Sequence, residues 1–167
     1  HLGIMDPTIP RGRRFTLSAN DLLAFDSFGY KVRGVDGDTV ALVSGVSQRG
    51  SIPAPGTGQA IVGSTQYTVQ VPSGATELKI DLSGNQDVDL YVRFNQRITP
   101  DSSGRPQADL VSESPTGVES VIASPSSSPS LTTGTYYIAV ANFGPGAASF
   151  DVRATVSGGG AGHSTPR

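Results

Sequence analysis

The feature that most constrains this fold is an alternation of apolar and polar residues with a period of two, which runs through residues 65–156. Tyr67, Val69 and Val71, for example, alternate with Thr68 and Gln70. Because successive side chains of a strand point to opposite faces of its sheet, this pattern predicts half-buried strands. The strands expected on this basis span residues 67–71, 78–82, 88–94, 118–123, 136–140 and 150–156.

Turn signals separate these strands at fairly regular intervals, which is typical of a sandwich or barrel. We therefore expect a mainly β protein, an antiparallel, jelly-roll-like β-sandwich over about residues 40–157, with one short N-terminal helix outside it. Residues 142–146, which read Asn-Phe-Gly-Pro-Gly, predict a hairpin between the last two strands. The side chains expected to point inward are Leu78, Ile80, Leu90, Val92, Ile138, Val140, Phe150 and Val152.

The first 33 residues contain the one helix signal of the chain, at about residues 19–28. Ser18 is a suitable N-cap, and Leu22, Phe25 and Phe28 form an apolar stripe at helical spacing, before Gly29 ends the pattern. A helix this short is marginal in water by itself. We therefore expect the stripe to be buried against a β-domain, either of the same chain or of a neighbour.

The chain divides by pattern into four parts. Residues 1–33 carry the helix, residues 34–56 form a Gly- and Pro-rich connector with a short strand at 40–43, and residues 57–157 form the sandwich. Residues 158–167 read as a flexible Gly-rich linker.

Several function classes are disfavoured by composition. The formal net charge is −2 and the isoelectric point is near 5.6, so nothing indicates a nucleic-acid partner. No run approaches the roughly 18 apolar residues needed to span a membrane. The chain lacks cysteine, and its two histidines, His1 and His163, stand at opposite ends. We therefore expect no catalytic triad, no zinc helix and no enzyme activity.

Two pairs of carboxylates are candidate calcium ligands. Asp87 and Asp89 share one face of a predicted strand, and Asp36 and Asp38 flank a tight turn. Calcium takes six to eight oxygen ligands, of which either pair would supply a fraction. The alternative is that these residues are solvated surface positions.

Residues 66–156 resemble the bacterial pre-peptidase C-terminal domain family. The resemblance rests on an ordered set of segments. These are Gln66-Tyr67-Thr68-Val69, Val71-Pro72-Ser73-Gly74-Ala75-Thr76, Gly84-Asn85-Gln86-Asp87-Val88-Asp89-Leu90-Tyr91-Val92-Arg93, Glu113-Ser114, Glu119-Ser120 and Gly134-Thr135-Tyr136-Tyr137-Ile138-Ala139-Val140. It implies a small β-sandwich appended to a secreted, extracellular bacterial protease. Relatives in bacterial collagenases bind collagen and calcium, but no aromatic surface here matches theirs residue by residue.

The N-terminal part resembles a different family. Ile4-Met5-Asp6-Pro7-Thr8 is similar to the Met-turn of metzincin-type metalloproteases, and residues 17–30 are similar to the helix that ends such catalytic domains. The zinc-binding segment that would precede Met5 is not in the sequence. The resemblance implies the C-terminal end of a metalloprotease domain, and without zinc-bound water it cannot hydrolyse peptides.

Two functions follow from these patterns. In the first, the chain is a non-catalytic accessory module that assists secretion, maturation or substrate binding, with the parent catalytic domain or an extracellular protein surface as partner. In the second, it is a structural subunit that polymerises into a filament. Its interface would then be Leu22, Phe25 and Phe28 together with Val40 and Leu42 on a strand added to a neighbour's sheet.

Overall fold

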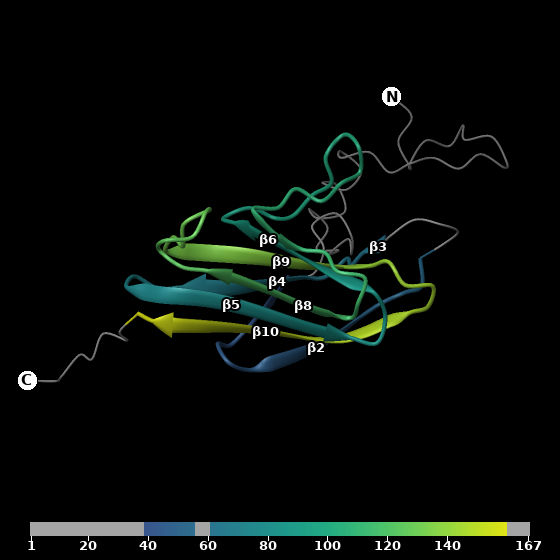
Figure 1. Cartoon of the computed structure of the whole chain (residues 1–167), viewed down its shortest axis with the longest axis horizontal. Coiled ribbons are helices and arrows are strands. Elements are labelled where there is room, and N and C mark those ends of the chain that lie inside the picture. Colours follow the sequence, from purple (N-terminus) through teal and green to yellow (C-terminus); the bar gives the residue numbers. More distant parts are fainter. Residues whose placement is uncertain (1–38, 56–60, 160–167) are drawn as a thin grey trace, which may run out of the picture. The chain divides into compact units, whose positions relative to one another are not determined.

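The described part of the chain is a sandwich of two β-sheets. A computed structural model describes residues 39–55 and 61–159. The predicted helix at 19–28, the metzincin-like segments, Asp36 and Asp38 lie outside these residues. The two sheets form the upper and lower layers of Figure 1. No helix of membrane-spanning length and hydropathy occurs among the described residues.

The first sheet has six strands, and the order β1-β4-β9-β6-β7 gives their neighbours, with β3 also paired to β9. Its strands are β1 (Thr39–Ala41), β3 (Ile61–Val62), β4 (Gln66–Val71), β6 (Val88–Phe94), β7 (Leu110–Ser112) and β9 (Gly134–Asn142). The second sheet has four strands in the order β2-β10-β5-β8. Its strands are β2 (Ser47–Ile52), β5 (Ala75–Gly84), β8 (Val118–Ala123) and β10 (Ala148–Gly158). All pairings are antiparallel except that of β1 with β4, which is parallel.

The core between the sheets is formed by the apolar side of each alternating strand, as the sequence predicts. All eight side chains expected to point inward are buried in one cluster. Ile80, Leu90, Ile138 and Val152 are completely buried. Burial of a side chain of this size stabilises the fold by roughly 1.5–3 kcal/mol. The period-two pattern therefore assigned the strand faces correctly.

The expected hairpin at residues 142–146 is wrong. β9 lies in the first sheet and β10 in the second, so this turn carries the chain from one layer to the other. The physical reason is that β9 is already paired on both sides, with β3 and β4 along one edge and β6 along the other. No edge of β9 is left for β10.

The segment that reads as a connector contributes strands to both layers. β1 adds to the edge of the first sheet, with Val40 opposite Tyr67, and β2 adds to the edge of the second, with Arg49 opposite Asp151. Gly50 of β2 lies where any side chain would collide with the core. A Cβ atom there would stand 2.2 Å from the Tyr67 hydroxyl oxygen and 2.4 Å from the Phe150 ring.

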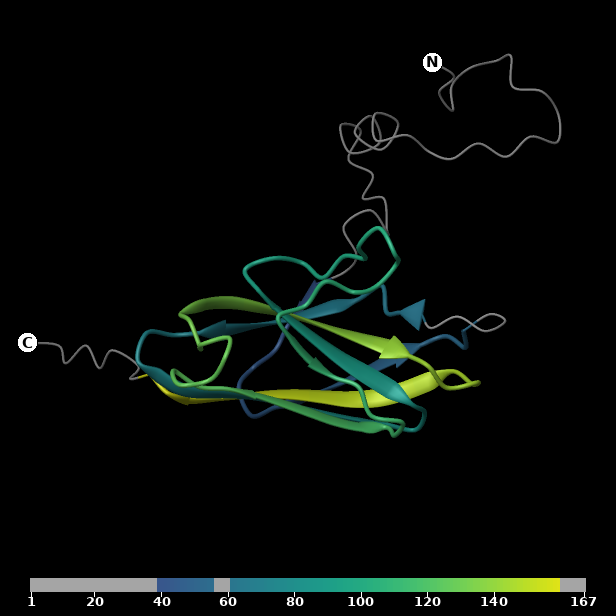
Figure 2. The same ribbon diagram turned by 45° about the horizontal axis from the view of Figure 1, so that its top comes forward.

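A long loop, residues 95–109, covers the outer face of the first sheet, as both views show (Figures 1 and 2). Ile98 and Ala108 pack there on Tyr91, Ala139 and Ala141 to form a second, smaller apolar cluster. The buried side chain of Gln66 holds the loop by two hydrogen bonds. It donates to the Ile98 carbonyl at 2.6 Å and accepts from the Ile98 amide at 3.0 Å.

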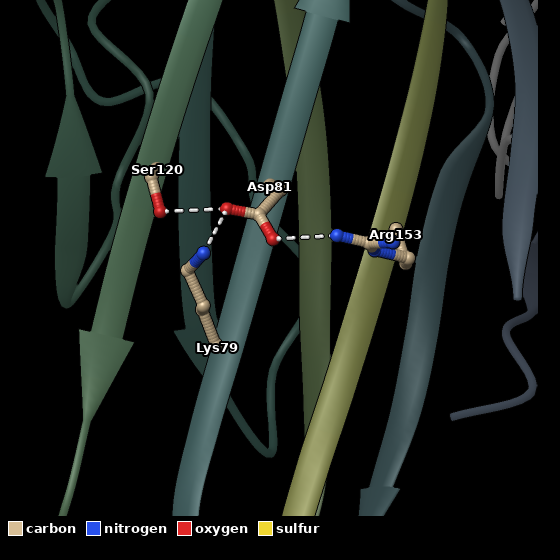
Figure 3. A network of polar contacts seen from close by, with 4 residues as sticks. All are labelled: Lys79, Asp81, Ser120 and Arg153. Carbon is tan, nitrogen blue, oxygen red and sulfur yellow. Dashed lines mark hydrogen bonds and ion pairs between the residues drawn. The ribbon is translucent and has the colours of Figure 1, made fainter. Parts of the chain in front are cut away.

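The outer face of the second sheet carries a polar network instead of a covering loop (Figure 3). Asp81 on β5 accepts from Lys79 at 2.9 Å, from Ser120 on β8 at 3.0 Å and from Arg153 on β10 at 3.4 Å. Partial burial raises the pKa of Asp81, but the hydrogen bonds from Lys79, Ser120 and Arg153 outweigh burial and lower it. The network ties three neighbouring strands together across this face.

Candidate functional site

A groove of about 680 Å³ lies on the outer face of the first sheet, beside the covering loop. Its polar walls are Asp89 and Tyr91 on β6, Arg105 on the loop and Glu113 just after β7, and Phe143 stands in the turn after β9. These residues share the groove because β6 lies between β7 and β9. On β6, Asp89 and Tyr91 alternate with Val88, Leu90 and Val92, which point into the core.

One tyrosine hydroxyl links the two carboxylates of the groove. Tyr91 Oη lies 2.8 Å from Glu113 Oε1 and 3.3 Å from Asp89 Oδ2, and Arg105 forms an ion pair with Glu113 at 3.5 Å. A tyrosine hydroxyl has a single proton, and O–H···O bonds are normally 2.5–3.0 Å long. Tyr91 therefore donates its hydroxyl proton to the nearer acceptor, Glu113. Burial, the two carboxylates and these hydrogen bonds raise the pKa of Tyr91, so its hydroxyl is protonated at neutral pH.

Asp89 has the least support of the buried polar side chains. Four polar side chains are buried in the described residues, namely Gln66, Asp89, Glu119 and Asn142. Glu119 accepts from the hydroxyls of Ser112 and Ser114 and from the Ser114 amide, and Asn142 makes three bonds to backbone groups. Asp89 is only 6% exposed, and its one contact is the long one to Tyr91. Its carboxylate thus faces the groove with a single long hydrogen bond, from a hydroxyl that also contacts Glu113.

The environment of Asp89 disfavours its charged form. Burial raises its pKa, the contact with Tyr91 opposes this, and the nearby charges of Glu113, Asp87 and Glu119 raise it further, so that its pKa is about 6. Burial of a carboxylate with few hydrogen-bond donors generally disfavours its charged form in this way. The wall of the groove therefore contains a poorly solvated carboxyl group, that of Asp89.

Backbone contacts fix the positions of the other groove walls. The Phe143 and Gly144 amides both donate to the Asp87 carbonyl, at 2.8 and 3.2 Å. A side chain on Gly144 would come within 2.5 Å of Gln86 Oε1, so this close packing requires glycine. The Phe143 side chain is nevertheless 49% exposed. An aromatic ring is thus presented to solvent from a well-anchored turn.

The opposite wall is fixed by Asp101. Its Oδ1 atom accepts from the Ser103 amide at 2.8 Å, from the Ser103 hydroxyl at 2.6 Å and from the Arg105 amide at 3.0 Å. The hydrogen bonds from Ser103 and Arg105 lower the pKa of Asp101. Asp101 therefore links Ser103 and Arg105 within the loop by hydrogen bonds to their backbone amides.

Of the sequence-predicted calcium ligands, Asp89 lies in the groove and Asp87 lies half-buried just before β6. Asp36 and Asp38 lie outside the described residues. Within residues 39–55 and 61–159, no group of three or more His, Cys, Asp or Glu residues is placed to hold a metal ion. Calcium binding stays a prediction.

The predicted interface residues fall in two places. Leu22, Phe25 and Phe28 lie outside the described residues. Val40 is half-buried in β1, and Leu42 is buried in the core of its own chain. Polymerisation through these residues stays a prediction.

Most of the groove residues carry no signal in the sequence. The period of two places Tyr91 only on the strand face opposite Leu90 and Val92, yet Tyr91 is 2% exposed, because the 95–109 loop covers it. Arg105 and Phe143 lie in loops without a chemical motif. The sequence does contain a signal for Glu113, because the pair Glu113-Ser114 is among the segments that resemble the family and follows the segment with Asp87, Asp89 and Tyr91.

Comparison with known families identifies the domain that carries this groove. Residues 63–142 match the family model of the bacterial pre-peptidase C-terminal domain. Those residues form a pre-peptidase C-terminal domain. All of β4, β5, β6, β7, β8 and β9 falls within the matched range. Pre-peptidase C-terminal domains are non-catalytic modules and are typically accessory domains of secreted proteases.

The solved structures that are similar to the chain include the pre-peptidase C-terminal domain of a collagenase from Bacillus anthracis, with 12% identity and a TM-score of 0.47 over 75% of this chain and 100% of that one. They also include PliG of Aeromonas hydrophila, a periplasmic inhibitor of g-type lysozyme. It has 13% identity and a TM-score of 0.45 over 71% of this chain and 96% of that one. No curated protein sequence matches the chain.

Proposed function

We propose that the chain is a non-catalytic accessory module of a secreted bacterial protease, and that it binds a polypeptide in the groove on the outer face of the first sheet. The bound polypeptide is a substrate or an extracellular protein surface. The proposal assigns no catalytic step to the chain, since its histidines are His1 and His163 and it has no cysteine.

The observation that carries the proposal is the combination of an exposed aromatic ring with convergent polar groups in one groove. Binding sites are concave, and they place a few polar groups among apolar ones. Phe143 supplies the apolar contact, and Asp89, Arg105 and Glu113 supply the polar ones. Asp101 and the Asp87 carbonyl hold the walls in place, which lowers the entropic cost of binding.

The experiment uses the full chain and an unfolded polypeptide. Reduced, carboxymethylated ribonuclease A is titrated onto the immobilised chain, and the affinity is measured by biolayer interferometry. Phe143→Ala is expected to weaken binding by at least about fivefold, as for the truncation of an aromatic anchor. The matched control is Ile122→Ala, because Ile122 is 53% exposed on β8 of the other sheet.

Binding by the parent chain that Ile122→Ala leaves unchanged and Phe143→Ala reduces would support the proposal. Absence of binding by the parent chain, or equal loss in both variants, would refute the groove as a polypeptide site.

A further inference from the structure

We propose that the groove recognises a cationic side chain, the ammonium of lysine or the guanidinium of arginine, which binds at the carboxylate of Asp89 beside the ring of Phe143. This inference rests on the proposed function, because it names the chemical group that the bound polypeptide presents. It follows from the position of Asp89 among its neighbours.

Asp89 is the buried polar side chain of the described residues with the fewest hydrogen bonds. The residue is only 6% exposed, and its Oδ2 atom accepts one long hydrogen bond, at 3.3 Å, from the Tyr91 hydroxyl, which lies closer to Glu113, at 2.8 Å. A buried carboxylate with so little hydrogen bonding is costly. The groove leaves room beside it, so a ligand that brings hydrogen-bond donors would remove this cost.

The local charges also favour a cation. The carboxylates of Asp87, Glu113 and Glu119 all act on Asp89, and each makes its surroundings more negative. Arg105 is the positive group that lines the groove, and it is paired with Glu113 at 3.5 Å. Glu119 is fully bonded to the Ser112 and Ser114 side chains and the Ser114 amide. Asp89 is therefore the buried carboxylate with the weakest hydrogen bonding.

An organic cation fits these walls better than a metal ion does. Calcium requires six to eight oxygen ligands, whereas the part of the chain that the structure describes places no three acidic or histidine side chains around one point. An alkylammonium brings three donors and a guanidinium brings five, so either can bond Asp89 and still contact the rest of the groove. The exposed ring of Phe143 adds an apolar surface for the side-chain stem and a π face for the charge.

The first test uses model side chains. The ¹⁵N-labelled full chain is titrated with N-acetyl-lysine methylamide, N-acetyl-arginine methylamide and the uncharged N-acetyl-norleucine methylamide. We expect saturable shifts of the Asp89, Tyr91, Glu113 and Phe143 amides with the lysine or arginine compound, at millimolar concentrations, and none with norleucine. The two cationic compounds show which of the two side chains the groove prefers. Equal shifts with norleucine, or no saturable shift at these amides with either cation, would overturn the inference.

Variants then assign the site. Asp89→Asn should weaken binding of the preferred cation by about tenfold or more, as expected when a hydrogen bond to a charged group is lost. Asp151→Asn is the matched control, since it removes the same charge from the outer face of the second sheet. Glu113→Gln should weaken binding less, because Glu113 is already paired with Arg105. Equal effects of Asp89→Asn and Asp151→Asn would show that only net charge matters, which overturns the site.

A second polypeptide separates this inference from the proposed function. Reduced, carboxymethylated ribonuclease A is carbamylated at its lysines and modified at its arginines with butanedione, which removes their positive charges. If the unmodified polypeptide binds and the modified one does not, the inference is supported. If both bind equally and Phe143→Ala weakens both, the module function stands and the cationic recognition fails. Calcium chloride is titrated as a further arm, and saturation of the same amides by Ca²⁺ but not by lysine or arginine compounds would also overturn the inference.

Discussion

Replacing Asp89 with asparagine measures the free-energy cost of keeping a buried carboxyl group in the wall of the groove. The pKa of Asp89 is about 6 in the fold, against an ordinary value of 3.8. At about 1.4 kcal/mol per pKa unit, this difference corresponds to about 3 kcal/mol. Asparagine has nearly the same shape, carries no charge, and can donate its amide hydrogen to Tyr91. We therefore expect Asp89→Asn to be the more stable protein at neutral pH.

The stability gained by Asp89→Asn should increase as the pH rises. Because the folded-state pKa is raised, the carboxyl binds its proton more tightly in the folded chain than in the unfolded one between pH 3.8 and about 6. The contribution of Asp89 to stability is therefore lost as pH rises through this window. The stability gained by Asp89→Asn should be about 1 kcal/mol at pH 4.5 and about 3 kcal/mol at pH 7.5, by the same linkage relation.

The assay is urea unfolding of the full chain followed by far-ultraviolet circular dichroism at several pH values, since the chain has no tryptophan. The control is Asp151→Asn, whose side chain is 50% exposed and 3.8 Å from Arg49. It should change stability by less than about 1 kcal/mol, with no trend across the window of Asp89. A less stable Asp89→Asn protein at pH 7.5, or a difference that does not vary with pH, would refute the reasoning.

Three further predictions concern other parts of the fold. Glu119→Ala should cost about 2–4 kcal/mol in urea unfolding, because it removes the acceptor of the Ser112 and Ser114 hydroxyls and of the Ser114 amide between β7 and β8; a cost below 1 kcal/mol would contradict this. Gly50→Ala should cost about 1–3 kcal/mol, because its Cβ atom would overlap Tyr67 and Phe150, and Tyr67→Phe should restore part of the loss in the double variant. The calcium prediction is checked by thermal melts with Ca²⁺ and with EDTA. A rise with Ca²⁺ that survives Asp89→Asn assigns the ion to Asp36 and Asp38, and a rise lost in that variant assigns it to Asp87 and Asp89; no response to either reagent contradicts calcium binding at both pairs.

The sequence by itself determined the strands and their inward faces. Leu90 and Val92 were assigned to the core because side-chain direction along a strand follows from local geometry, with a period of two. The Gly and Pro residues at 142–146 located the turn between the last two strands. The sequence also indicated the family, because the segment from Gln86 to Arg93 and the other matching segments follow one another in the order typical of that family.

Only the tertiary structure decided how the strands pair and where the groove lies. The turn at 142–146 looks the same in sequence whether it joins neighbours in one sheet or crosses between two, and the occupied edges of β9 made that choice. Asp89 and Tyr91 look like solvated residues until Ile98, held by Gln66 from 32 residues away, packs over their face. These outcomes depend on contacts between residues far apart in the chain, which no local period encodes. The side chains of the groove are therefore brought together by packing rather than by a motif.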